Sequence, residues 1–313
     1  MEIVTDSSSD NSTDSEEHQI FYSYESLSSS ENLFLSTTGM KLQCFNNSFF
    51  PACEPIITSK RKKMGRKNVL SCIDEAVMIL VFLRKGGTYK DVGIKFGISE
   101  SRIRIIIRDD IFAIAQLYEN CIEWMNLGSQ ERHLSEEELV GFSSCVGIID
   151  ATEIKINRPK KNNLQRKFYS GKKKQHCVKF QIIVQPLNGQ IISLGRLHKG
   201  KDHDFKLFKN SGIYDVVGNE ESLMGDSGYQ GMDNYCNAII PKKKPRRNRL
   251  SQEDATRNEI ISRRRVIVEH VFAKMKKFRI LGNKWIGKVT NQQLLEKIIF
   301  IVGIIVNINN PDN

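Results

Sequence analysis

Residues 146–152 of the 313-residue chain read VGIIDAT, a short apolar run that stops at one carboxylate. A run of this kind, bounded by turn-forming residues, predicts a strand that is buried on both faces of a sheet. Asp150 then lies at or just past the end of the strand, where the rim of the sheet can present its carboxylate to a ligand. An Asp at this place is also typical of a turn or a helix cap, so its partners elsewhere in the chain decide between the two interpretations.

The residues after this run alternate between strand-like and helical patterns. A second apolar run, SLMGD at residues 222–226, also ends in a carboxylate, and Asn188-Gly189 is typical of a hairpin turn. Residues 153–156 are expected to fold back as a separate short strand. Further strands are predicted at residues 177–184, 190–196 and 238–241, and helices at residues 204–209, from 253 to about 278, and at 292–307. This pattern predicts a mixed α/β sheet domain over residues 145–313.

Glu269 is a third candidate acid, on the long helix predicted after residue 253. It follows Val268 of the apolar face, so it is expected on or beside the buried face, where a carboxylate is unfavourable without a partner. Arg265, one turn earlier, could be that partner in a structural salt bridge. The alternative is that Asp150, Asp226 and Glu269 hold divalent cations, because hard oxygen ligands suit Mg²⁺ or Mn²⁺.

Charge is distributed unevenly along the chain. The net charge is +11, but residues 1–58 carry nine acids and one base, a balance of −8 that leaves +19 for the rest. A body this basic predicts a polyanionic partner, most simply nucleic acid. The seven cysteines include no CxxC pair, which favours free thiols. No signal peptide and no apolar run long enough to cross a bilayer is found, so no membrane association is expected.

The first 68 residues are expected to be a disordered tail, because they are rich in Ser, Asn and acidic residues. The tail ends in the basic run KRKKMGRK at residues 60–67. Such a run is a solvated linker, a nuclear-import signal or an arm that binds phosphates.

Residues 69–128 predict an all-α domain with a helix-turn-helix. Helices are expected at residues 74–83, 89–96 and 100–108, with a further supporting helix at 111–124, and Gly97 lies in the tight turn before the third helix. The third helix would expose side chains that can reach bases and phosphates, namely Ser101, Arg102, Arg104 and Arg108. The alternative is an ordinary three-helix bundle. Residues 129–144 are expected to link this domain to the sheet domain.

Three acidic motifs follow this helix-turn-helix domain along the chain. In this order they resemble the DDE endonuclease domain of PIF/Harbinger-type transposases, which are similar to insertion-sequence transposases of the IS5 group. The motifs are GIID at residues 147–150, GDSGY at 225–229 and Arg265-x-x-x-Glu269 followed by Lys276. YSGKK at residues 169–173 and the pair His203-Asp204 are further matches.

The resemblance implies an RNase H-like fold in which Asp150, Asp226 and Glu269 are the catalytic residues and bind two divalent metal ions, Mg²⁺ or Mn²⁺. It further implies that the catalytic domain contacts DNA through Lys172, Lys173, Arg265 and Lys276. The expected partner is double-stranded DNA at transposon terminal repeats, bound by a homo-oligomer in the nucleus, with a Myb-like DNA-binding protein as a second partner.

The chain departs from the family pattern next to the first acid. Ala151 stands where Gly is more common, at a point where the backbone is expected to turn beside the metal. Two functions other than that of an active transposase remain open. One is a domesticated, catalytically silent DNA-binding or adaptor protein, and the other is a general phosphodiesterase of the same fold.

Overall fold

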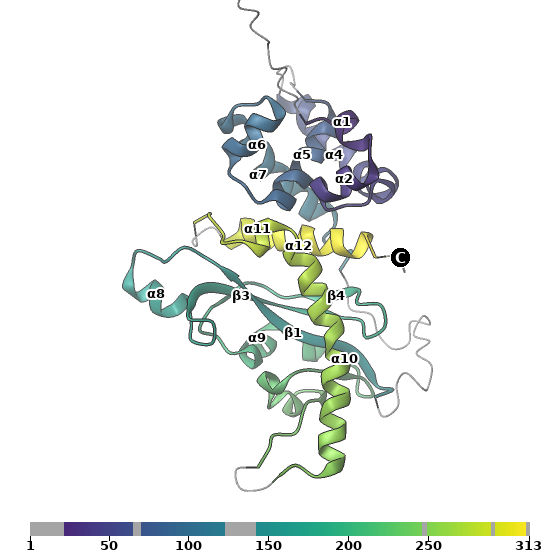
Figure 1. Cartoon of the computed structure of the whole chain (residues 1–313), viewed down its shortest axis with the longest axis vertical. Helices are drawn as coiled ribbons and strands as arrows, with labels where there is room; N and C mark the ends of the chain where they lie inside the picture. Colours follow the sequence, from purple (N-terminus) through teal and green to yellow (C-terminus); the bar gives the residue numbers. More distant parts are fainter. Residues whose placement is uncertain (1–21, 65–69, 123–141, 246–248, 289–291, 311–313) are drawn as a thin grey trace, which may run out of the picture.

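The computed structural model describes residues 22–64, 70–122, 142–245, 249–288 and 292–310, which are arranged in three layers along the long axis of the molecule (Figure 1). N-terminal helices form one end, two C-terminal helices lie across the middle, and a sheet with its flanking helices forms the other end. Within these ranges no helix is both long and apolar enough to span a membrane. All seven cysteines are free thiols.

The N-terminal layer is organised around one helix that is buried on every side. Its helical segments are α1 (Tyr24–Ser28), α2 (Glu31–Thr38), α3 (Leu42–Cys44), η1 (Phe45–Phe49), α4 (Phe50–Met64), α5 (Cys72–Lys85), α6 (Tyr89–Phe96) and α7 (Glu100–Leu117). Every residue of α5 from Glu75 to Leu83 is buried. A helix with apolar residues on every side must be surrounded by other elements. Five helices pack against it, namely α1, α2, α4, α6 and α7.

The prediction of a disordered tail over residues 1–68 is wrong for residues 22–64, which are helical, while the rest of that range lies outside the described residues. The serines that suggest low complexity are helix caps, since Ser23 and Ser30 each accept a hydrogen bond from a backbone N–H in the first turn. The apolar islands between them are core residues, and Phe34 is fully buried. The segment folds because it packs against the apolar surface of α5, which α1, α2 and α4 all contact.

The first residues of the basic run are part of the fold as well. Lys60 and Arg61 lie on α4, where Arg61 Nη2 is 2.5 Å from Glu75 Oε2. Lys60 pairs with Asp110, whose side chain is fully buried on α7. The ion pairs of these two side chains therefore link α4 to α5 and α7, so Lys60 and Arg61 are not part of a free phosphate-binding arm.

The helices expected around the turn at Gly97 are present. Gly97 ends α6 with a φ of +65°, and a Cβ added at Gly93 would lie 2.4 Å from the carbonyl oxygen of Ile98, so the chain passes very close to the helix there. The expected break between a third helix and a supporting helix is absent, and α7 runs unbroken to Leu117. Its buried isoleucines form one stripe, namely Ile103, Ile106, Ile107, Ile111 and Ile114.

The sheet mixes antiparallel and parallel pairs. Its strands are β1 (Cys145–Lys155), β2 (Tyr169–Ser170), β3 (Gln175–Val184), β4 (Ile191–Leu194), β5 (His198–Lys199), β6 (Ser222–Met224) and β7 (Asn237–Ile239). The order is β2-β3-β1-β6-β7, with β4 and β5 also paired to β3. β3 is antiparallel to β1 and to β4, whereas β6 is parallel to both β1 and β7. The predicted Asn188-Gly189 turn is present, with Gly189 at a φ of +72°.

β1 is one strand of 11 residues, so the predicted fold-back of residues 153–156 is wrong. The cause is β3, whose antiparallel register with β1 continues without a break through residue 155. Asp150 therefore lies within the strand and not at its end. Ala151 pairs with Gln181 in ordinary extended backbone, so the turn expected at this residue is absent.

Helices cover both faces of the sheet. They are α8 (Asn162–Phe168), α9 (Asp204–Ser211), α10 (Gln252–Lys276), α11 (Arg279–Gly282) and α12 (Gln292–Ile308). The long helix α10 crosses the face that carries Ile148, through Val268 and Val271. Ile149, on the opposite face, packs in a second core with Phe208 of α9.

One apolar core joins the N-terminal helices to the α10 face of the sheet, and α12 lies at its centre (Figure 1). This helix packs against α7 and against β4. Gly303 allows the close approach to β4, because an added Cβ there would lie 3.2 Å from Leu194 Cδ1. The Asn307 side chain hydrogen-bonds both the N–H and the carbonyl of Ile191, each at 2.9 Å. The two predicted domains therefore share a core.

Replacing Phe34 by Ala tests whether α2 is part of the folded body. Phe34 is fully buried, so we expect a loss of about 3–5 kcal/mol of unfolding free energy, measured by urea denaturation. Leu33→Ala on the same helix is the control, because Leu33 is 43% exposed and its loss should change stability by no more than about 0.5 kcal/mol. Equal stability of the two variants would contradict the packing described here.

Candidate active site

The parallel pairing of β1 with β6 brings the first two predicted acids together. The last residues in this pairing are Ile148 of β1 and Met224 of β6. Asp150 and Asp226 each follow two residues later in strands that run the same way. The two carboxylates therefore lie next to each other where β6 ends beside the middle of β1, and the backbones of paired strands are about 4.8 Å apart.

Asp226 is fixed where the chain leaves β6. It is the N-cap of the short helix η3 (Ser227–Tyr229), and its Oδ1 accepts a 2.7 Å hydrogen bond from the backbone N–H of Gly228. Oδ1 is thus oriented by the backbone. β6 ends here, so β1 continues beyond its parallel partner.

A cavity of about 770 Å³ lies along the part of β1 that extends past β6. The three predicted catalytic acids and the four cations predicted to contact DNA in this domain all line it. Its acidic lining residues are Asp150, Glu153, Asp204, Asp226 and Glu269, and its basic ones are Lys155, Lys172, Lys173, Lys179, Arg265 and Lys276. Residues from β1, β3, α9, α10 and the 172–175 turn thus converge on one space.

Arg265 pairs with Asp150 and not with Glu269. Its Nη2 lies 3.2 Å from Asp150 Oδ2, and the two side chains are only 14% and 16% exposed. The Arg265 Nε is buried without a hydrogen-bond acceptor among the described residues. The guanidinium therefore keeps one donor that is free for a ligand oxygen.

Glu269 lies one turn after Arg265 on α10, but its side chain is exposed. Glu269 therefore lies beside the buried face and not on it, and Arg265 does not form the structural salt bridge that was one of the two alternatives. Its neighbour Val268 is fully buried, and one residue along a helix turns the side chain by about 100°, which carries Glu269 to the cavity wall. Solvent access there lets water hydrate the carboxylate, so it does not need a protein partner.

Asp150 is the acid with the most perturbed titration in this site. Burial raises the pKa of its carboxyl from the ordinary 3.8 to about 6, against the opposing effects of Arg265 and of the Ala151 N–H. The negative charges of Asp226 and Asp204 also raise this pKa. A buried carboxyl beside two others favours a bound cation that neutralises the group.

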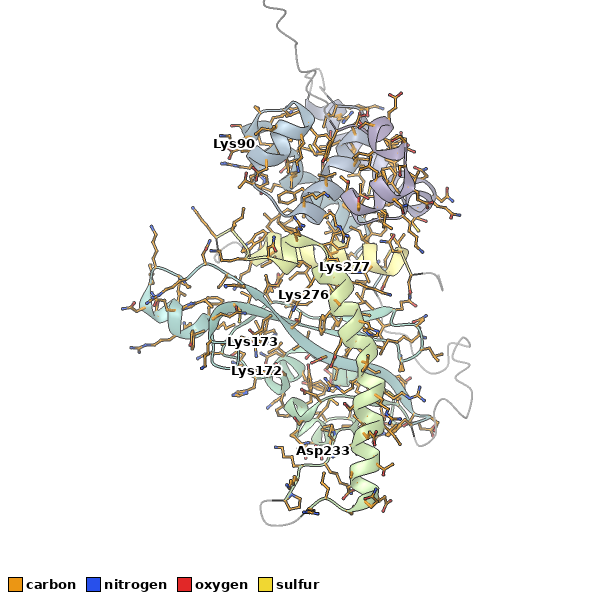
Figure 2. The ribbon with its side chains drawn as sticks, in the orientation of Figure 1. Lys90, Lys172, Lys173, Asp233, Lys276 and Lys277 are labelled. Atoms are coloured by element: carbon orange, nitrogen blue, oxygen red, sulfur yellow. The ribbon has the colours of Figure 1, made fainter. Side chains whose placement is uncertain are left out.

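A row of lysines borders the acidic part of the cavity. Lys172 and Lys173 are exposed residues of the turn before β3, and Lys276 lies at the C-terminal end of α10 (Figure 2). Desolvation lowers the pKa of Lys276, and the charge of Lys173 lowers it further. Two lysines that repel each other at the edge of a cavity favour the binding of a phosphate group between or above them, because its negative charge offsets their repulsion.

The structure adds to the site two charged residues that lie in none of the sequence motifs, Lys179 and Glu153. Lys179 of β3 has its Nζ 3.4 Å from Asp204 Oδ1 and 3.8 Å from Glu153 Oε1. Glu153 Oε1 also accepts a 2.7 Å hydrogen bond from Ser170. The His203-Asp204 and YSGKK matches were the only signals in the sequence that pointed to Asp204 and Ser170.

The predicted DNA-contacting residues of the helical region lie on α7, away from the cavity. Ser101, Arg104 and Arg108 are exposed, and each of the two arginines pairs with an acid on its own helix. Arg102 differs from the prediction, because it is half-buried and lines a small pocket with residues of α4 and α5.

The part of the chain that forms this cavity is similar to known proteins. Residues 149–310 match the family model for the DDE superfamily endonuclease, a span that includes all three predicted acids. The chain belongs to this family, and it is an enzyme of the nuclease and transposase class. It is 32% identical over 255 residues to a protein of Microchaete diplosiphon described as a probable transposase for insertion sequence element IS702. That alignment covers 80% of this chain and 86% of the relative. No solved structure gives a significant match.

Enzymes of the DDE superfamily generally use divalent metal ions. The carboxylates of this cavity fit such an ion by their chemistry, because Mg²⁺ and Mn²⁺ prefer oxygen ligands. In the part of the chain that the structure describes, however, no three Asp, Glu, His or Cys side chains are placed to hold one ion together. Arg265 pairs with Asp150 instead, so these carboxylates would have to rotate toward a common point to share one ion.

The raised pKa of Asp150 makes stability depend on pH. The folded protein holds this proton more tightly than the unfolded chain does, so the carboxyl lowers stability as pH rises from about 4 to about 6. A pKa difference of about 2 corresponds to roughly 3 kcal/mol. Asp150→Asn cannot ionise, so its unfolding free energy relative to wild type should increase by roughly this amount between about pH 4 and pH 7.

The unfolding free energies of wild type and Asp150→Asn are measured by urea denaturation in metal-free buffer. Asp233→Asn, on the exposed turn η4 (Met232–Asn234), is the control and should follow the wild-type pH dependence. Parallel pH profiles for Asp150→Asn and wild type would show that Asp150 is not held in the environment described here.

Proposed function

We propose that this protein is a transposase that cleaves and joins DNA at transposon ends by two-metal phosphoryl transfer in an RNase H-like domain. Asp150, Asp226 and Glu269 are the proposed catalytic and metal-binding residues. The observation that carries this proposal is the shared cavity, in which two acids from adjacent parallel strands and one from α10 face a border of lysines. The sheet order, with three antiparallel strands followed by two parallel ones, is consistent with such a nuclease domain.

The bound Mg²⁺ or Mn²⁺ ions would activate water or a DNA 3′-hydroxyl and stabilise the leaving oxygen. The residues of the chain would position the DNA for this step. Lys172, Lys173 and Lys276 are placed to bind backbone phosphates at the cavity border. Arg265 has a buried Nε with no acceptor among the described residues, so it can donate to a phosphate oxygen deeper in the cavity.

The helical region would bind the same DNA through α7 as the recognition helix of a helix-turn-helix. The exposed residues Ser101, Arg104 and Arg108 support this role, and Arg102 would contribute from the half-buried edge of the helix. Backbone and base contacts in the major groove would hold the terminal repeat while the sheet domain acts on it.

The motif resemblance supports a PIF/Harbinger-type subclass for this transposase. In that setting the protein would act in the nucleus as a homo-oligomer on double-stranded DNA, together with a Myb-like DNA-binding partner. The motifs GIID, GDSGY and Arg265-x-x-x-Glu269, all present in this chain, are the support for this part of the proposal.

One observation favours a second function, that of a catalytically silent DNA-binding or adaptor protein. Among the described residues the acids are not placed to hold one ion, and Arg265 neutralises Asp150. A chain that kept this arrangement permanently would bind DNA without cleaving it. The ability to bind Mn²⁺ separates the two functions.

Replacing Asp226 by Asn tests the catalytic proposal. The purified chain with Mg²⁺ or Mn²⁺ should nick duplex DNA that carries the terminal repeats flanking its gene. Asp226→Asn removes a negative oxygen ligand and should lower the nicking rate by about 100-fold or more, beyond the cost typical of outer-shell groups. Gel analysis of end-labelled DNA measures the rate.

Asp233→Asn makes the same chemical change outside the cavity and should nick at the wild-type rate. Equal rates for wild type and Asp226→Asn would exclude this active site. A duplex of the same length without the repeats separates a transposase from a general phosphodiesterase, because only the latter should cut both duplexes equally.

Salt dependence tests the lysine border. A lysine that binds one phosphate contributes about 1 to the slope of log affinity against log salt concentration. Lys276→Gln should reduce this slope by about 1, because Lys276 lines the cavity. Lys277→Gln is the matched control, since Lys277 is the next residue but does not line the cavity. Fluorescence anisotropy with labelled duplex measures the slope, and equal slopes for the two variants would contradict this DNA path.

A further inference from the structure

Asp204 belongs to the cavity although the triad does not include it. It is the first residue of α9 and lines the same space as Asp150, Asp226 and Glu269. A carboxylate at the start of a helix is favourable on its own, because it faces the positive end of the helix dipole. That structural role explains an acid at this position but not its orientation toward the other acids.

The oxygens of Asp204 and Asp226 face the same small space. A Cβ added at Gly228 would lie 2.8 Å from Asp226 Oδ1 and 3.2 Å from Asp204 Oδ2. Gly228 therefore keeps open a gap that has a carboxylate oxygen on two sides. Two negative oxygens across an open gap are unfavourable unless a cation separates them.

Lys179 supplies a positive charge to Asp204, but from the side opposite the gap. Its Nζ contacts Asp204 Oδ1, at 3.4 Å, and leaves Oδ2 to face Gly228. The side chain of Lys179 is only 11% exposed, so β3 and its neighbours hold this cation in place. One oxygen of Asp204 is thus neutralised from within the protein and the other is available.

A buried hydroxyl beneath the acids also lacks a partner. Tyr229 is fully buried, and its hydroxyl has no hydrogen-bond partner among the described residues. Burial raises the pKa of this hydroxyl well above its ordinary value, and the negative charges of Asp150, Asp204 and Asp226 raise it further. A buried donor without an acceptor is costly, and a carboxylate that rotates toward a shared ion can become that acceptor.

We propose that Asp204 is a fourth carboxylate of the metal-binding site, which contributes Oδ2 to an ion shared with Asp226 across the gap at Gly228. Lys179 holds Asp204 in this orientation and competes with the ion for its charge. This inference rests on the proposed metal-dependent function and adds a ligand to it.

The test is Mn²⁺ binding by the full chain without DNA, measured by titration calorimetry. Asp204→Asn should weaken binding about 10-fold or more, and Asp226→Asn should weaken it at least as much. Asp233→Asn is the matched control and should bind like wild type, because Asp233 is exposed and does not line the cavity. Thermal unfolding of each variant in metal-free buffer shows whether the fold is kept.

Two further variants separate a metal ligand from a helix-stabilising residue. Gly228→Ala changes no charge but fills the gap, so it should also weaken Mn²⁺ binding. Lys179→Met removes the competing cation and should tighten binding by roughly 3-fold, the size of one partly exposed ion pair. This gain should vanish when Asp204→Asn is added. A purely structural Asp204 would lower the melting temperature in its variant and leave Mn²⁺ affinity unchanged throughout.

The outcomes distinguish this inference from the function on which it rests. If wild type binds Mn²⁺ and Asp226→Asn loses it while Asp204→Asn does not, the fourth carboxylate is excluded and the triad stands. If wild type binds no Mn²⁺, both the metal-dependent function and this inference fail. Weakened binding in Asp204→Asn together with tighter binding in Lys179→Met supports the proposal.

Discussion

The site depends on where one pair of parallel strands stops. β6 pairs with β1 only as far as Met224 and Ile148, and β1 then continues alone on that side with β3 as its support. This difference in length creates both the concentration of negative charge and the cavity beside it. A longer β6 would pair with the strand edge that now lines the cavity, and a shorter β1 would remove the wall that Glu153 and Lys155 form. The candidate active site of this chain therefore depends on the difference in length between these two strands.

The acids in this mismatch are accompanied by cations of the protein itself. Arg265 contacts Asp150, and Lys179 contacts both Asp204 and Glu153. Such pairs lower the cost of gathering carboxylates in a partly buried space, where unpaired charges are strongly unfavourable. They also mean that any incoming cation competes with residues already in place. Binding of ions and of phosphate can then support each other, because a phosphate accepts the guanidinium that a metal ion displaces from Asp150.

Local patterns predict the features that depend on neighbours in the chain. The apolar runs before Asp150 and Asp226, the Asn188-Gly189 turn and the turn at Gly97 all follow from short-range chemistry and are present. The errors concern contacts between distant residues. Arg265 reaches Asp150 across 115 positions, and only the rotation of α10 over β1 decides that Glu269 is exposed. The continuity of β1 through Asp150 is imposed by β3, which no pattern within β1 reveals. Residues 22–64 resemble low-complexity sequence until α5 is recognised as a helix that needs cover on all sides.

Helix α12 has a consequence for the order in which the molecule can assemble. It packs between α7 and β4, and its Asn307 side chain hydrogen-bonds the backbone N–H and carbonyl of Ile191. Asn309, just beyond it, bonds the carbonyl of Gly39 and the N–H of Lys41 between α2 and α3. During synthesis this helix leaves the ribosome after every element that it joins. The helical region and the sheet can each begin to fold earlier, but the core they share closes only when α12 arrives. The helical region and the sheet can therefore join in one core only after α12 has been synthesised.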